Sequence, residues 1–174
     1  MSTSKFAAQL TVQIGEEFAA HHQYLAVAAH YEGMTLPQLA GCFYRQATEE
    51  HGHAMMMVQY LLDTDQPVRF PATGAPQSEF DGVIAPIELA VAQEKRVTAQ
   101  INELTRIARD ENDFAAEQFM QWFIKEQVEE VSKMQDLLTV ARRSGDDLND
   151  IEAYVERDMG AGAADPTAPR QAGQ

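Results

Sequence analysis

The chain has little cysteine, few basic residues and no long hydrophobic run. Cys42 is its single cysteine, so the sequence excludes an internal disulfide framework and a thiolate metal site. Only 13 basic residues face 27 acidic ones, and this net charge of -14 argues against binding to nucleic acid or to an anionic membrane. The same charge favours the attraction of cations, although an acidic surface that only contacts solvent would give the same composition.

Targeting signals are also missing from the sequence. The first ten residues, MSTSKFAAQL, lack the basic region and apolar run of a secretory signal, and no apolar stretch approaches membrane-spanning length. We therefore expect a cytoplasmic protein. The 174 residues suit one domain with a sizeable core, which we place at residues 1–158. Residues 159–174 are rich in Gly, Ala and Pro and predict a flexible C-terminal tail.

Five helices are predicted, over residues 5–32, 36–63, 84–110, 113–144 and 147–157. Gly33, Met34 and Thr35 predict a tight turn, which makes the first two helices antiparallel. The prolines and glycines between residues 64 and 83 exclude a helix there. About 20 extended residues reach about 65 Å, whereas a helix of this size spans about 40 Å, so the stretch can cross the whole bundle and the second and third helices can be parallel. The pattern thus predicts an all-α four-helix bundle, with a long crossover between helices 2 and 3 and a short fifth helix at the C-terminal end.

Each long helix carries an apolar stripe that polar residues interrupt. Residues three or four apart share one face of a helix, so the interrupting side chains point into the core with the stripe. They are Glu17, Glu50, His53, Glu94, Gln127 and Glu130. Glu17, Glu50, Glu94 and Gln127 each lie about 10 to 15 residues from the start of their helix, near its midpoint, and therefore share one level of the bundle. A buried, unpaired carboxylate costs roughly several kcal/mol, so this group needs a compensating charge, such as a pair of metal cations.

The donor types favour iron or manganese. Carboxylate-bridged di-iron bundles take one Glu from each of two helices and a Glu-x-x-His pair from each of the other two. Glu17 and Glu94 match the single carboxylates, and Glu50 with His53 matches the first Glu-x-x-His pair. The second pair is altered, because Gln127 and Glu130 stand where the pattern has Glu and His. Oxygen-rich ligands without thiolate argue against structural zinc.

Further residues lie near this level. Tyr24 is two turns after Glu17. Either its hydroxyl reaches a metal-bound carboxylate, or its ring only packs in the core. His21 is either an outer partner of Glu17 or a satisfied core histidine. Trp122, one position off the fourth stripe, is expected to pack against a neighbouring helix or subunit. A second set of acids predicts either a third, more exposed cation site or a solvated surface: Glu49, Glu126 and Glu129.

Two segments, ATEEHGHAMM at 47–56 and EQFMQWFIKEQVEE at 117–130, resemble the non-haem ferritins of bacteria, most closely the actinobacterial ones. The likeness runs from Phe6 to about Arg157. It implies a ferritin-like fold and a hollow homo-oligomeric shell of 24 subunits, which oxidises Fe(II) with O2 or H2O2 and stores a ferric mineral. One iron would be held by Glu17, Glu50 and His53. The other would be held by Glu50, Glu94 and Glu130, with Gln127 nearby.

The resemblance also implies that Glu50 bridges the two irons and that Glu49, Glu126 and Glu129 form a third iron site. Haem-bearing bacterioferritins have Met directly after the Glu of the first pair, whereas this chain has His51, so no haem is expected.

Other functions remain open. A rubrerythrin or manganese catalase would share the bundle, although the chain lacks the Cys-x-x-Cys pairs of a rubrerythrin. A non-catalytic shell scaffold would not need ligands on all four helices. A DNA-protecting mini-ferritin places its metal site between subunits, whereas this chain supplies a whole set.

Overall fold

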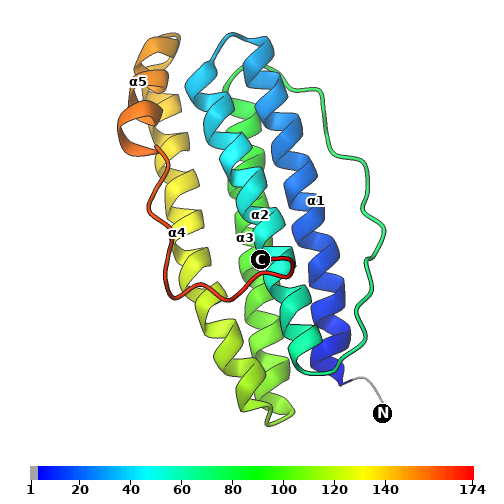
Figure 1. Cartoon of the computed structure of the whole chain (residues 1–174). Coiled ribbons are helices and arrows are strands. Elements are labelled where there is room, and N and C mark those ends of the chain that lie inside the picture. Colours follow the sequence, from blue (N-terminus) through cyan, green and yellow to red (C-terminus); the bar gives the residue numbers. More distant parts are fainter. Residues whose placement is uncertain (1–3) are drawn as a thin grey trace.

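The computed structural model describes residues 4–174, and these form a helical bundle without strands (Figure 1). The five helices are α1 Lys5–Gly33, α2 Pro37–Asp63, α3 Ile84–Asp110, α4 Phe114–Ser144 and α5 Leu148–Asp158. Their ends agree with the predicted ends to within about one residue, so the predicted all-α architecture is confirmed. The first three residues of the predicted domain lie outside the described residues. None of the helices described is both long and apolar enough to cross a membrane.

The crossover sets the direction of the helices. Residues 64–83 run the full length of the bundle along the outside of α1, so α2 and α3 point the same way, as predicted (Figure 1). The loop passes close to α1 at Gly15, where an added Cβ would lie 3.0 Å from the Cβ of Pro71. A side chain at this position would push the loop outward, and the loop path therefore depends on a glycine inside α1.

Local residues define most helix ends. The turn between α1 and α2 has its left-handed residue at Thr35 (φ 61°), and Gly33 still belongs to α1. Asn112 (φ 56°) makes the corresponding turn between α3 and α4. Asp113 and Asp147 are the N-caps of α4 and α5, and their side chains accept hydrogen bonds from the first turn of each helix.

Two helices are capped by glutamates from distant parts of the chain. The carboxylate of Glu111 accepts hydrogen bonds from the backbone N–H groups of Lys5 and Phe6, both at 3.0 Å. Glu152 of α5 accepts from the N–H groups of Gln38 and Leu39 at the start of α2, at 2.8 and 2.9 Å. The cap position of α2, Leu36, has no side-chain cap of its own. These carboxylates satisfy free N–H groups and oppose the positive end of the helix dipole.

The apolar core consists of two clusters with a polar layer between them. One cluster lies toward α5 and includes Tyr24, Tyr31, Phe43, Ile87, Leu137 and Ile151. The other lies toward the opposite end and includes Phe6, Leu10, Met57, Leu104, Met120 and Phe123. The residues that interrupt the stripes occupy the middle of the bundle, which is the single level that their spacing predicts.

The tail, residues 160–174, contains no helix and runs from α5 across α4 to α2 (Figure 1). The backbone N–H of Ala172 donates to the carbonyl oxygen of Met55 at 3.0 Å. Ala168 and Ala172 pack against the core cluster that contains Phe123. Arg170 forms an ion pair of 3.1 Å with Asp63. The composition of the tail predicts that it forms no helix, but it does not predict these contacts with the bundle.

Candidate metal centre

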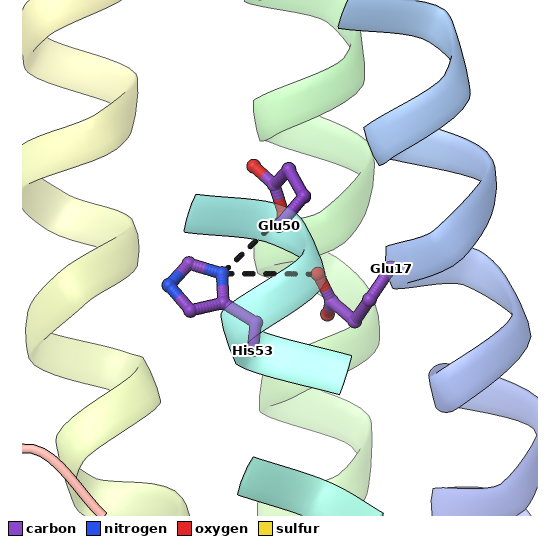
Figure 2. A group of neighbouring side chains, drawn as sticks. All are labelled: Glu17, Glu50 and His53. Carbon is purple, nitrogen blue, oxygen red and sulfur yellow. Dashed lines mark hydrogen bonds and ion pairs between the residues drawn. The ribbon is translucent and has the colours of Figure 1, made fainter. Parts of the chain in front are cut away.

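Three predicted ligands meet in the middle of the bundle, as Figure 2 shows. Glu17 comes from α1, and Glu50 and His53 come from consecutive turns of α2. Nδ1 of His53 lies 3.3 Å from Oε2 of Glu50 and 3.9 Å from Oε2 of Glu17. One donor atom from each of the three residues lies within 4.8 Å of the other two, and all three side chains are buried. This arrangement can hold a metal ion.

The other two helices bring further donors to the same level. Glu94 of α3 accepts a hydrogen bond from the hydroxyl of Tyr24, which is fully buried. Nε2 of Gln127 on α4 donates to Oε2 of Glu94 at 3.2 Å and to the hydroxyl of Thr98 at the same distance. The structure thus places the side chains of both Tyr24 and Gln127 on the carboxylate of Glu94.

Glu130 of α4 has two partners that the stripe argument did not single out as site residues. Oε2 of Glu130 accepts from Nε2 of Gln46 at 2.5 Å, and Oε1 accepts from Nζ of Lys133 at 3.0 Å. Lys133 also donates to Gln46 at 2.6 Å and lies 3.6 Å from Glu49. The signal was present in the sequence, because Gln46 is one turn before Glu50 on the same stripe and Lys133 is three residues after Glu130.

The electrostatics of the centre favour a cation. Burial and the nearby Glu50 raise the pKa of Glu17 well above its usual range. Burial and the charge of Glu94 raise the pKa of Glu50 in the same way. Burial is also the main cause that raises the pKa of Glu94 to about 7, against the opposing hydrogen bond from Tyr24. Buried carboxyl groups that lie close together do not ionise easily. A bound metal ion would stabilise their ionised forms, because it supplies positive charge.

One buried oxygen is left without a hydrogen bond. Oε2 of Glu17 has no hydrogen-bond partner, although Oε1 accepts from the buried amide of Gln13 at 2.9 Å. A buried acceptor without a partner costs about 1–3 kcal/mol. This oxygen is the one that faces Nδ1 of His53, so the residues present fit a metal ligand set. Gln13 is a further outer partner, and it lies one turn before Glu17.

The predicted third set of acids lines a cavity of about 490 Å³ between α2, α4 and the tail. Glu49, Glu126 and Glu129 all face it, together with His53, so the cavity adjoins the centre. Among residues 4–174, however, the donor atoms of three acids or histidines come within 4.8 Å of one another only at Glu17, Glu50 and His53. Glu49, Glu126 and Glu129 therefore line one cavity, but their donor atoms do not form a compact group.

His21 forms its hydrogen bond with the backbone of α2 rather than with Glu17. Its Nδ1 lies 2.6 Å from the carbonyl oxygen of Ala47, and its ring packs beside those of His22 and His51. It is a half-buried histidine with a backbone partner. Trp122 is half-buried and packs edge-on against His53, with 5.6 Å between ring centroids. The expected helix contact of Trp122 is therefore with α2.

This fold is that of a known class of proteins. A model of the ferritin-like domain matches residues 7–144, and the chain belongs to the ferritin family.

Ferritin BfrB of Mycolicibacterium smegmatis is 51% identical over 170 residues, which cover 98% of this chain and 94% of that protein. A bacterial non-heme ferritin of Staphylococcus aureus is 34% identical, over 87% of this chain and 91% of that protein. Among solved structures, an open pore ferritin of the archaeon Archaeoglobus fulgidus aligns with a TM-score of 0.86 and 30% identity. That alignment covers 90% of this chain and 96% of the archaeal one. These similarities agree with the predicted likeness to actinobacterial ferritins.

Proposed function

We propose that this protein stores iron and oxidises Fe(II) at a di-iron centre inside each subunit. The observation that carries the proposal is the buried group of acids from all four long helices, with raised carboxyl pKa values and an unsatisfied oxygen on Glu17. Membership of the ferritin family supports iron as the substrate. A group of buried acids that only stabilised the fold would be expected to have a hydrogen bond for every oxygen.

The proposed ligands divide between two iron positions. Glu17, Glu50 and His53 hold one Fe(II), and Glu50, Glu94 and Glu130 hold the other, with Gln127 beside it. Glu50 is the bridging ligand in this proposal. Its closeness to His53 on one side, and the effect of the Glu94 charge on its pKa, support that role. Tyr24 and Gln127 orient Glu94 through their hydrogen bonds.

The reaction is a two-electron oxidation of a pair of ions. Each Fe(II) gives up one electron, and the pair reduces one O2 with two protons to H2O2, or one H2O2 with two protons to two waters. The protein holds the two ions side by side and screens their charge with carboxylates. We further propose that Glu49, Glu126 and Glu129 bind iron on its way between the centre and the interior of a closed 24-subunit shell, where ferric mineral collects. Haem is not part of this proposal, because His51 stands at the methionine position.

Two variants test the ligand assignment. Mixing two Fe(II) per subunit with aerobic buffer in a stopped-flow instrument measures the first ferric product by absorbance. Glu50→Ala should slow this step by more than about 100-fold, because the loss of a bridging ligand exceeds the usual effect of an outer partner. Glu129→Ala is the matched control, since it removes an exposed acid of the adjoining cavity. It should keep the fast step and alter later turnovers.

Folding should survive in both variants, which circular dichroism and light scattering would check. If Glu50→Ala oxidises iron as fast as the unaltered protein, the four-helix centre is not the site of oxidation.

A further inference from the structure

The tail contains one carboxylate that is linked to the proposed metal centre through a single side chain. Oδ2 of Asp165 accepts a hydrogen bond from the indole Nε1–H of Trp122 at 3.0 Å. The ring of Trp122 lies against that of His53 at an interplanar angle of 72°. Asp165 thus touches the side chain that packs on a proposed iron ligand, although it lies 43 residues from Trp122 in the sequence.

Asp165 is itself held in place. Its Oδ1 accepts from the backbone N–H of Thr167 at 2.8 Å and from the Thr167 hydroxyl at 2.6 Å. Nζ of Lys125 lies 3.6 Å from Oδ2. The hydrogen bonds from Thr167, and then the one from Trp122, lower the pKa of Asp165 to about 2. The carboxylate is therefore an ionised acceptor at neutral pH, with both oxygens in use.

The ring of His53 is positioned by one hydrogen-bond contact, from Nδ1 to Oε2 of Glu50 at 3.3 Å, and otherwise by packing. Its Nδ1 faces Glu50 and Glu17, whereas Trp122 and Phe123 both meet the ring edge to face, with centroids at 5.6 and 5.9 Å. Phe123 is buried, but Trp122 is only partly so and lines the cavity beside the centre. A half-exposed indole has room to change its rotamer unless its N–H is held by an acceptor.

The far end of the tail fixes its path over the cavity. Gln171 lies directly against Gly52, where an added Cβ would meet its Nε2 at 2.9 Å. Ala172 bonds to the backbone of α2, and Asp165 bonds to α4. The tail thus spans the two helices that carry His53 and Trp122, and it closes one side of the cavity that His53 lines.

We propose that Asp165 is a positioning residue for the metal centre: it holds Trp122, and Trp122 holds the imidazole of His53 in the orientation that binds iron. The proposal rests on the proposed function, in which His53 is an iron ligand. The tail thereby takes part in metal binding without contributing a ligand.

Trp122 is the only tryptophan of the chain, so its fluorescence reports on this contact directly. Co(II) serves as a probe that does not undergo the iron reaction. Titrating the metal-free full-length protein with Co(II) gives an affinity from the visible absorption band, and Trp122 emission gives the state of the indole. We expect Asp165→Ala to shift the emission to longer wavelength and to weaken binding of the first Co(II) by about 10-fold, the lower end of outer-partner effects.

Removal of Asp165 also removes a negative charge from the cavity, and a double-mutant cycle separates the two effects. Trp122→Phe keeps an aromatic ring against His53 but has no N–H donor. If Asp165 acts through Trp122, Asp165→Ala should change Co(II) affinity by less than about 2-fold in the Trp122→Phe background. An equal loss in both backgrounds would mean that Asp165 acts only through its charge, and the proposal would be wrong.

Two further variants complete the design. Arg170→Ala loosens another anchor of the tail, the ion pair with Asp63, and should leave emission and Co(II) affinity unchanged. His53→Ala should abolish binding of the first Co(II). If it does not, His53 is not a ligand, and the ligand assignment falls together with this proposal. If His53→Ala abolishes binding but the cycle is additive, only the positioning role fails.

Discussion

Among its side chains, the centre has more acidic groups than basic groups to balance them. Burial disfavours the charged form of Lys133, but attraction by Glu130 and Glu49 and its hydrogen bond to Glu130 raise its pKa overall. Lys133 thereby balances Glu130. Glu17, Glu50 and Glu94 have no such lysine in the described structure. Burial is the main cause of their raised pKa values, and the charges of nearby carboxylates add to it. Without a basic partner, these buried carboxyl groups keep their protons to a higher pH than free carboxyl groups do.

This imbalance predicts how stability depends on pH. The pKa of Glu94 is about 7 in the folded chain, above its ordinary value of 4.5, so between these values the folded state binds a proton that the unfolded state releases. The resulting stability is complete below the ordinary pKa and is lost as pH rises through about 7. Without metal, the melting temperature should therefore be lower at about pH 8 than at about pH 6.

Calorimetry in the presence of a chelator measures this difference, and Glu94→Gln should reduce it. Saturation with Co(II) should reduce it as well, because the metal replaces the protons. A metal-free protein that melts at the same or a higher temperature at the higher pH would contradict the charge imbalance.

At the scale of elements, α5 is joined to the bundle by a polar contact as well as an apolar one. Ile151 and Val155 are buried in the core cluster near Tyr24. Glu152, between them, covers the uncapped start of α2 with two hydrogen bonds. The short helix thus stabilises the beginning of the helix that carries Glu50 and His53.

Removing that carboxylate should loosen the first turn of α2. Glu152→Ala should cost about 1–2 kcal/mol locally, the usual worth of a helix cap with a favourable dipole interaction. Hydrogen exchange of the peptide containing Gln38 and Leu39 should quicken by about 5- to 30-fold. Glu156→Ala, which removes an exposed acid of the same helix, is the control and should leave this exchange unchanged. Equal exchange in the two variants would show that the contact does not cap α2.

At the scale of the whole molecule, several large apolar side chains remain on the surface. Phe70 on the crossover is 61% exposed, and Phe114 at the start of α4 is 71% exposed. Scattered exposed apolar residues are ordinary, but in a ferritin a closed symmetric assembly offers a place to bury them. The exposed Phe70 lies beside Phe18 of α1, so this face of the crossover is apolar over two rings.

The resemblance to bacterial ferritins implies 24 subunits, so we expect sedimentation to find a particle of about 24 times the 19.4 kDa chain. Phe70→Glu should shift the population toward smaller species, because assembly would bury an unpaired charge. Ser78→Glu adds the same charge at an exposed polar position of the same crossover and should assemble normally. An unaltered protein that sediments as a monomer or dimer at neutral pH would rule out the closed shell.

The sequence alone determined the helices and the level of the centre. Periodicity is a local property: residues three and four apart must share a helix face, so Glu17, Glu50, Glu94 and Glu130 point inward whatever the neighbouring helix does. Their similar distance from the helix starts placed them at one height. The length and proline content of residues 64–83 gave the direction of α3 by the same kind of local reasoning.

Which side chains pair with each other depends on how the helices pack in three dimensions. Gln46 bonds to Glu130 across 84 residues, Glu152 caps a helix 113 residues earlier, and Asp165 reaches Trp122 from the tail. These contacts depend on the spacing and rotation of the packed helices. A shift of a helix by less than the width of a side chain would make or break such a hydrogen bond. Periodicity fixes the face on which a residue lies, whereas the distance across that face is set by the packing of all the helices together.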